Sequence, residues 1–455
     1  MVKSKLFFLF VALLAMAEAA TAETIPVCNK LSQNLRKKKL TLVELTDIAL
    51  SCHPSTTLAW AQTRTALANL GIAKSAYWPQ VSLGSNWTYS SAKAGAGRVD
   101  NIPPNPTYNY IYGPSISLSY LLWDFGATRQ KVKAADFQAK ASQFSENYNF
   151  QSVIMAVEQA YYQLLGQKSL VDVYKNSIQE NKLNLKTATA LRKQGVSTIG
   201  DVYQAESGLS QAKFNYQQAE GQLKIYQGQL ATSLGIPITT NLKLESLPKK
   251  IISKPLMGSI HKLIKIAKET RPDLLAAEAQ VRAAAAQLKA AKMAFLPTLN
   301  MTNSIVRSYS PQTQVRASNN TAMLSLSIPL FSGLSQVYAV KAASAAETQA
   351  LALEKQANQA VDSQVWQAYY NLETTEKTLK SSDDVLVSSL QSAKQAFGQY
   401  KAGVGNILNV LATRVTAENA QAQAIQAKLN WYIALTQLSE ALGQLSAPVN
   451  VETLP

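Results

Sequence analysis

Few side chains in this sequence could do acid–base, nucleophilic or metal chemistry. Its two histidines, His53 and His261, are more typical of surface or helix-end residues than of a base or a metal ligand, and Asp383-Asp384 is typical of a solvated helix face. Metal-ligand spacing, a phosphate-binding glycine loop and a nucleophile elbow are all missing from the sequence. We therefore predict that the protein is not an enzyme and uses no catalytic residue, metal or cofactor.

The first residues predict export. Lys3 and Lys5 precede an apolar run over 6–16, and Ala20-Thr21-Ala22 offers a small-residue cleavage site. This is the pattern of a secretory signal peptide, assigned to 1–22, and its apolar run is too short to cross a bilayer. The formal net charge of +16 comes from scattered basic residues. That scatter favours a solvated face, anionic lipid or an acidic partner over nucleic acid.

The two cysteines, Cys28 and Cys52, both lie near the mature N-terminus. In an oxidising compartment they could form one local disulfide. Their separation in the sequence does not by itself place them at bonding distance. Such a bridge would anchor an N-terminal arm and carry no chemistry.

The chain repeats itself, which predicts its organisation. Two prolines 25 residues apart occur as Pro54 and Pro79 and again, offset by 218, as Pro272 and Pro297. Further on, an Ala-Tyr-Tyr segment, a Gly-Val pair and a Leu-Gly pair each recur at an offset of 208. We assign repeat 1 to 23–235, a proline-bearing linker to 236–256, repeat 2 to 257–443 and a tail to 444–455.

Each repeat contains a segment in which the apolar period is two, as in a β-strand. We predict β-hairpins at about 80–123 and about 298–331, with strands of about nine to eleven residues. Serine and threonine occupy the alternate face, and Trp87, Tyr89, Tyr110, Tyr112 and Trp123 suit aromatic girdles at the two surfaces of a membrane. The alternating apolar residues are Val81, Leu83, Trp87 and Tyr89, then Ile116, Leu118, Tyr120 and Leu122, then Leu299, Met301 and Ile305, and then Leu324, Leu326, Ile328 and Leu330.

Four strands are too few to close a barrel around a lumen. In lipid, the open edges of such a sheet would leave unpaired backbone groups, each costing several kcal/mol. Other copies of the chain must therefore complete the sheet. Three copies of a four-stranded sheet would form a twelve-stranded transmembrane β-barrel, with a polar lumen and an apolar outer face.

The remaining segments predict long helices. Between Gly126 and Gly195, and between Leu334 and Ala402, no proline interrupts the chain, and each segment would span roughly 100 Å as a helix. Apolar residues recur in heptads there and in the returning segments, for example at Val410, Ala417, Ala424, Trp431 and Leu438. We predict two antiparallel helical hairpins, 126–235 and 333–443, packed as coiled coils. Shorter helices are expected at 55–77 and 272–295, after a capping box at Thr41-x-x-Glu44.

In this order, and twice over, these features resemble the TolC-like outer-membrane factors of Gram-negative tripartite efflux and type I secretion systems. The resemblance also covers the strand ends Leu122-Trp123-Asp124-Phe125-Gly126 and Leu330-Phe331-Ser332-Gly333. It implies a mixed α and β membrane protein: a homotrimer with its barrel in outer-membrane lipid and a large helical part in the periplasm. It further implies docking to a periplasmic adaptor (membrane fusion) protein and an inner-membrane ABC, RND or MFS transporter. The cargo would be small molecules or unfolded protein.

The resemblance also implies functional residues at the ends of the helical hairpins. The adaptor-contacting tips would be Gly195 and Val196 in repeat 1 and Gly403 and Val404 in repeat 2. Asp201 matches an acidic gate position, and Tyr400 matches a tyrosine that can link to it, so an Asp201–Tyr400 latch is expected at the periplasmic gate.

Repeat 2 departs from the pattern of the best-known members. Asn409 and Ala412 stand where those members place two aspartates that ring the entrance, and Gly405 stands where a latch arginine occurs. A threefold acidic ring would favour cations, so ion selectivity is open for this chain. Two other interpretations also stay open at this point: a secreted coiled-coil structural or adhesive protein, and a passive porin.

Overall fold

The computed structural model describes residues 39–92, 107–240, 242–244, 259–311 and 313–445. The predicted signal peptide, Cys28, most of the linker and nearly all of the tail lie outside these residues. The chain divides into two compact units. We call them the helical unit, which comprises the chain up to 58, 149–267 and the chain from 364 onward, and the strand unit, which comprises 59–148 and 268–363.

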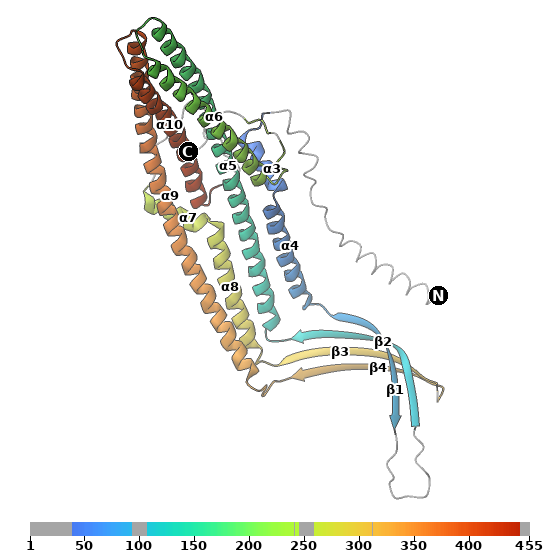
Figure 1. Cartoon of the computed structure of the whole chain (residues 1–455). Coiled ribbons are helices and arrows are strands. Elements are labelled where there is room, and N and C mark those ends of the chain that lie inside the picture. Colours follow the sequence, from blue (N-terminus) through green and yellow to red (C-terminus); the bar gives the residue numbers. More distant parts are fainter. Residues whose placement is uncertain (1–38, 93–106, 241, 245–258, 312, 446–455) are drawn as a thin grey trace, which may run out of the picture. The chain divides into compact units, whose positions relative to one another are not determined.

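The two halves of the chain contain the same elements in the same order (Figure 1). In the first half these are α3 (Leu42–Cys52), α4 (Pro54–Ser75), β1 (Gln80–Ala92), β2 (Thr107–Trp123), α5 (Ala127–Lys193) and α6 (Ile199–Ser233). In the second half they are α7 (Ile260–Thr270), α8 (Pro272–Met293), β3 (Thr298–Ser310), β4 (Val315–Ser327), α9 (Ser335–Lys401) and α10 (Ile407–Ala441). The bounds of α9 and α10 are those of α5 and α6 shifted by the 208 residues of the sequence repeat. The expected mixed fold of four strands and long helices is confirmed.

In the strand unit, the four strands form one antiparallel sheet in the order β1-β2-β3-β4. Its register places Ser82, Ser117, Ser304 and Thr321 in one row across all four strands. The neighbouring row lies on the opposite face, because side chains alternate along a strand. It is apolar on the first three strands, with Leu83, Ile116 and Ile305, and continues to Asn320 on β4. The predicted division into a serine and threonine face and an apolar face is therefore present.

The strands are longer than the predicted nine to eleven residues: β1, β3 and β4 each have 13 residues and β2 has 17. The extra pairs lie toward the hairpin connections, where Tyr-rich and Ser-rich segments keep the strand period. The end of the second hairpin was predicted too late, at 331, since β4 ends at Ser327. Pro329 accounts for this, because it cannot donate to a ladder and it restricts the residue before it.

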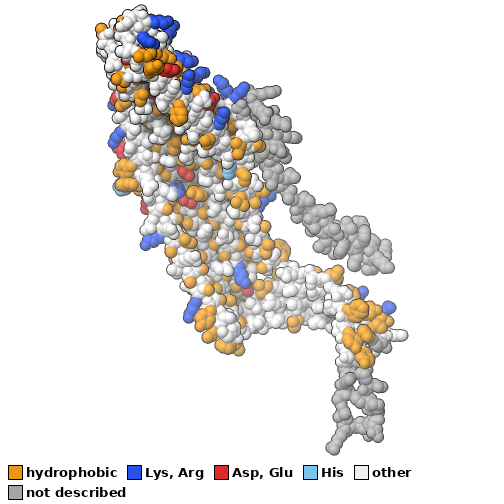
Figure 2. All heavy atoms as spheres, viewed as in Figure 1, with side chains coloured by type: hydrophobic (Ala, Val, Ile, Leu, Met, Phe, Trp, Pro, Cys, Tyr) orange, Lys and Arg blue, Asp and Glu red, His pale blue; other side chains and the backbone are white. Residues whose placement is uncertain are grey.

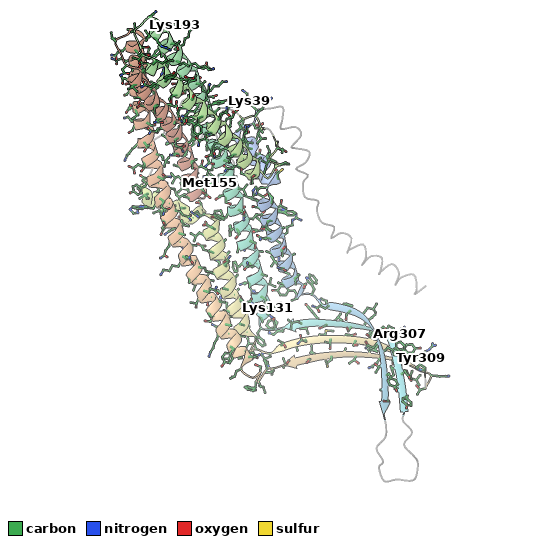
Figure 3. The ribbon with its side chains drawn as sticks, in the orientation of Figure 1. Lys39, Lys131, Met155, Lys193, Arg307 and Tyr309 are labelled. Carbon is green, nitrogen blue, oxygen red and sulfur yellow. The ribbon has the colours of Figure 1, made fainter. Side chains whose placement is uncertain are left out.

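Gly113 lies where the backbones of β2 and β3 approach closely. A Cβ at this position would stand 2.8 Å from the carbonyl carbon of Arg307 on β3, so only glycine allows the two backbones to approach this closely. Pro114 follows it, and the pairing of β2 with β3 is interrupted between Tyr112 and Ser115. Figure 3 marks Arg307 and Tyr309 at this part of β3.

In the helical unit, α3 packs with α5 and α6 around Leu45, Val157, Leu230 and Leu234, which are all fully buried. The predicted capping box begins α3: the Thr41 backbone N–H donates to the Glu44 carboxylate, and the Glu44 N–H donates to the Thr41 hydroxyl. On α10, all five predicted heptad residues, from Val410 to Leu438, are buried. The short helices α3 and α7 were not predicted as separate elements.

Among the described residues, no helix is both long enough and apolar enough to cross a membrane.

Candidate functional site: hairpin ends and strand faces

The two long helical hairpins turn in the same way. Gly195 and Gly403 both have a φ of 76°, which a residue with a side chain rarely adopts. The Val196 N–H donates to the Leu191 carbonyl at 2.9 Å, and the Val404 N–H donates to the Gln399 carbonyl at 3.1 Å. Glycine thus ends α5 and α9 with the same hydrogen-bonded cap.

The returning helices begin differently. The Thr198 side chain and the Asp201 carboxylate form a capping box at the start of α6, with the Thr198 N–H donating to the carboxylate at 3.0 Å. At the start of α10, the Asn406 side chain instead accepts the Leu408 N–H at 2.9 Å. Asn409, which corresponds to Asp201, is exposed. The carboxylate predicted to close the gate therefore also caps a helix.

Asp201 and Tyr400 line the same small cavity of about 270 Å³, together with Val196, Gly403 and Gly405. Tyr400 is only 3% exposed, and burial together with the nearby Asp201 carboxylate raises the pKa of its phenol. Its hydroxyl lies near Ser197 but makes no hydrogen bond of standard geometry within the described chain. The structure brings the two predicted latch residues together without a hydrogen bond between them, and the latch stays a prediction.

The backbone around Gly405 leaves no room for a larger side chain beside this cavity. A Cβ on Gly405 would stand 2.7 Å from the Tyr400 backbone nitrogen, closer than real Cβ contacts allow. An arginine there would require the turn between α9 and α10 to move.

The outer surface of the hairpin ends is apolar at its extremity and basic around it. Val196 and Val404 are 55% and 80% exposed. Arg192 and Lys193 occupy the last turn of α5, and Lys401 ends α9. These cations suit helix C-termini. Figure 2 shows basic side chains near this end of the helices, and Figure 3 labels Lys193 there.

A polar seam between α5 and α10 was not predicted. The Thr436 hydroxyl donates to the Glu158 carboxylate at 2.7 Å, the Ser177 hydroxyl donates to Glu418, and Arg414 pairs with Glu180 at 2.7 Å. Glu158 is 6% exposed, and burial raises the pKa of its carboxyl. The only signal in the sequence was the presence of polar residues between the apolar heptad positions.

The strand unit carries aromatic residues toward both ends of its sheet. Near the hairpin connections, the Tyr89 ring lies 5.0 Å from the Tyr110 ring, and Tyr112 lies 5.5 Å from Tyr309 on β3. At the other end, Trp123 packs edge-on against Phe125 at 6.0 Å. Val81, Leu83 and Trp87 are among the exposed apolar residues of the sheet, and Figure 2 shows hydrophobic side chains at the surface over the strands. Aromatic residues thus lie toward both ends of the sheet, and their place at the two surfaces of a membrane stays a prediction.

The remaining candidates lie apart from these sites. His53 follows α3 as its C-cap residue. Its Nδ1 accepts the Ser55 N–H at 3.2 Å, and burial lowers the pKa of its imidazole. His261 is exposed on α7. The described part of the chain contains no group of three or more His, Cys, Asp or Glu side chains that could hold a metal. Cys52 ends α3, and because Cys28 lies outside the described residues, their disulfide stays a prediction.

The model of the family described as "Outer membrane efflux protein" matches this chain at residues 45–236 and 263–444. Protein CyaE of Bordetella pertussis is 26% identical over 421 residues, covering 90% of this chain and 84% of that protein. Outer membrane protein TolC of Escherichia coli is 24% identical over 428 residues, covering 89% and 82%.

Solved structures share the fold. The outer membrane protein VceC of Vibrio cholerae superimposes with a TM-score of 0.77 at 18% identity, covering 88% of this chain and 96% of that one. The open state of the MtrE outer membrane channel of Neisseria gonorrhoeae gives a TM-score of 0.76 at 22% identity, covering 89% and 90%.

Proposed function

The chain belongs to the outer membrane efflux protein family, and on that premise we propose that it works as a homotrimer that joins a periplasmic adaptor and an inner-membrane transporter to the exterior. It is a channel of the efflux and type I secretion class, not an enzyme. It lies in the outer membrane and has a helical periplasmic extension. Family membership decides against a secreted coiled-coil structural or adhesive protein.

One observation carries the proposal of a trimer: the four-stranded sheet has two open edges, at β1 and β4. One face of this sheet bears serine and threonine, and the other bears exposed apolar residues. In lipid, the outer edges of β1 and β4 need partners, because each unmet backbone group costs several kcal/mol. Pairing β4 of one copy with β1 of the next satisfies both edges, and three copies close twelve strands around a polar lumen.

The hairpin ends support the docking of an adaptor. Val196 and Val404 present apolar side chains at corresponding places in the two repeats, on turns of the same geometry. A trimer would offer six such turns, and an adaptor with an apolar contact surface could engage each of them. The transporter class stays among ABC, RND and MFS, and the cargo is either a small molecule or an unfolded protein.

Deletion of the protein tests its export role. Loss of the channel should raise the susceptibility of the cells to toxic small molecules, abolish the secretion of a specific exoprotein, or both. Complementation with the intact chain should restore each phenotype. A deletion strain unchanged in both respects would indicate a passive porin. The trimer is tested separately, by the mass of the protein extracted in mild detergent.

A further inference from the structure

Within one chain, helix α10 covers one face of helix α5. Thr436 bonds to Glu158 at 2.7 Å, and the Tyr432 ring stacks on the Tyr162 ring at 4.9 Å and 11°. One turn further along, Leu429 lies against the backbone of Gly166. These three contacts define what we call the internal seam.

The sequence repeat maps the internal seam onto a second pair of helices. A shift of 208 residues converts α5 into α9, and the reverse shift converts α10 into α6. The residues of α9 that correspond to Glu158, Tyr162 and Gly166 are Trp366, Tyr370 and Thr374. The residues of α6 that correspond to Thr436, Tyr432 and Leu429 are Gly228, Lys224 and Gly221. We call these six residues the external seam.

The α9 half of the external seam is uncovered in a single chain. Trp366 is 50% exposed and Tyr370 is 42% exposed, and their rings pack together at 4.9 Å. Glu158, which corresponds to Trp366, is 6% exposed because α10 lies over it. Within the described residues, a face that is buried in repeat 1 is thus about half exposed in repeat 2, and it carries Trp366 in place of Glu158.

The side-chain sizes in the external seam compensate one another. The internal seam pairs two side chains of medium size, Glu158 and Thr436. At the corresponding positions of the external seam, Trp366 has a large side chain and Gly228 has no side chain. The pair of Gly166 and Leu429 corresponds to Thr374 and Gly221. The glycine therefore lies on the long helix α5 in the internal seam and on the shorter helix α6 in the external seam. A Cβ on Gly221 would meet nothing within 4 Å in the single chain. Interfaces need such matching of volume, because packed cores tolerate neither voids nor overlap.

A cavity lies where the α6 half of the external seam would receive the indole. Its volume is about 350 Å³, and its lining includes Lys224 and Gly228 of α6 with Ile238, Thr240 and Leu242 of the segment that follows. The Ile238 side chain is 69% exposed and forms an apolar wall without a cover. Glycine at 228 keeps the floor of this cavity open.

We propose that Trp366 and Tyr370 on α9 of one copy insert into the cavity at Lys224 and Gly228 on α6 of a second copy. This inference rests on the ring assembly proposed above and names the contact that joins neighbouring copies. The Trp366 indole fills the space over Gly228 and packs on Ile238. The Lys224 ammonium lies over the Tyr370 ring, so a cation–π contact replaces the tyrosine stack of the internal seam.

The contact can be tested by disulfide crosslinking. Thr374→Cys and Gly221→Cys correspond to the closest approach in the internal seam, and both are introduced into the full chain. Oxidation in isolated outer membranes should give covalent dimers and trimers on a non-reducing gel, at least tenfold above either single variant. The single variants also report any pairing with Cys28 or Cys52. A matched control combines Thr374→Cys with Phe214→Cys, one heptad away on α6, and should remain uncrosslinked.

The outcomes separate this inference from the proposed function. A protein that is trimeric in detergent but crosslinks through Phe214→Cys, or through neither pair, would overturn the contact and leave the trimer standing. A monomeric protein would overturn both.

Filling the cavity is a second test. Gly228→Trp should lower the fraction of trimer at least fivefold, and adding Trp366→Ala should restore most of it. Gly228→Ala should keep the trimer: its Cβ would stand 3.3 Å from the Ile238 Cγ2, a tight contact, but the 69% exposed Ile238 side chain is free to shift by the few tenths of an ångström needed. Full assembly of Gly228→Trp would overturn the inference.

Discussion

Leu429 on α10 lies so close to Gly166 on α5 that a Cβ on Gly166 would stand 2.7 Å from the Leu429 Cγ. This contact sets the distance between a helix of repeat 1 and a helix of repeat 2. It also explains a glycine in the middle of a 67-residue helix, where glycine ordinarily costs stability.

We expect Gly166→Ala to destabilise the protein. The added methyl group overlaps a side chain and must separate the helices, at a cost of about 1–3 kcal/mol. That cost outweighs the gain of about 1 kcal/mol from helix propensity. Thermal unfolding in detergent, followed by circular dichroism at the helix band, measures the change. Gly71→Ala in α4 is the control, since a Cβ there meets nothing within 4 Å and should raise stability. An equal gain at Gly166 would contradict the packing described.

The stability of the helical unit should depend on the charge of Glu158. Burial raises the pKa of this carboxyl in the folded protein, and the Thr436 hydrogen bond opposes that rise. The protonated form is therefore favoured by folding. The contribution of this carboxyl to the free energy of unfolding is fully present below its unfolded-state pKa. That contribution is lost as the pH rises through its folded-state pKa. Each tenfold difference in proton affinity between the folded and unfolded states corresponds to about 1.4 kcal/mol.

Glu158→Gln should accordingly be more stable than the wild type at neutral pH and equal to it in acid. Parallel thermal unfolding of both proteins from pH 4 to pH 8 measures this difference. A difference independent of pH would show that the carboxyl does not titrate in this range. Asp383→Gln, which alters an exposed carboxylate of α9, controls for the general effect of charge.

Arg414 should hold α10 to α5 near the hairpin ends. Its guanidinium pairs with Glu180 at 2.7 Å, and the side chain is only 18% exposed. We expect Arg414→Ala to lower the free energy of unfolding by about 1 kcal/mol. This value is at the upper end of the range for ion pairs that are partly exposed, as the Glu180 side chain is here. Lys140→Ala, which breaks an exposed i,i+4 pair with Asp136, should cost no more than about 0.5 kcal/mol. Equal losses would mean that the Arg414 pair contributes no more than an ordinary surface pair.

The predicted latch can be separated from the helix cap. Asp201→Ala should raise the single-channel conductance in planar bilayers if the carboxylate helps to close the gate. Thr198→Ala removes the capping partner of Asp201 but keeps the carboxylate, so it should weaken the start of α6 by about 1 kcal/mol without opening the channel. The same rise in both variants would attribute the effect to the cap.

Tyr400→Phe tests the other side of the latch. The hydroxyl is buried and has no hydrogen bond of standard geometry in the described chain, so removing it should leave stability unchanged or slightly higher. A latch that forms through this hydroxyl in the assembled channel should instead give Tyr400→Phe the conductance of Asp201→Ala. Bilayer recordings of the two variants distinguish these results.

Local patterns predicted most of the fold. The alternation of Leu83 and Ile116 with serines predicted strands, and the heptad spacing from Val410 to Leu438 predicted a helix packed along one face. The Asp201 cap was also local, since Thr198-x-x-Asp201 has the spacing of a capping box. The family resemblance assigned Asp201 to the gate, and its role as a helix cap was not predicted.

Contacts between distant residues could not be predicted in this way. Glu158 and Thr436 are 278 positions apart, and no pattern around either one identifies the other. The burial of Tyr400 depends on residues from α5, α6, α9 and α10 that meet at one place. The sequence repeat was the one long-range signal available, because it places corresponding residues on corresponding helices.

The equal lengths of the helices have a consequence for engineering. Helices α5 and α9 each have 67 residues, and α6 and α10 each have 35. One inserted residue in any of these helices would rotate the rest of that helix by about 100°. The faces of that helix would then no longer correspond to those of its counterpart in the other repeat. An epitope tag or a labelling peptide therefore belongs outside the helices. The connection between Ser310 of β3 and Val315 of β4 is suited to this use, because an insertion there shifts no helical face.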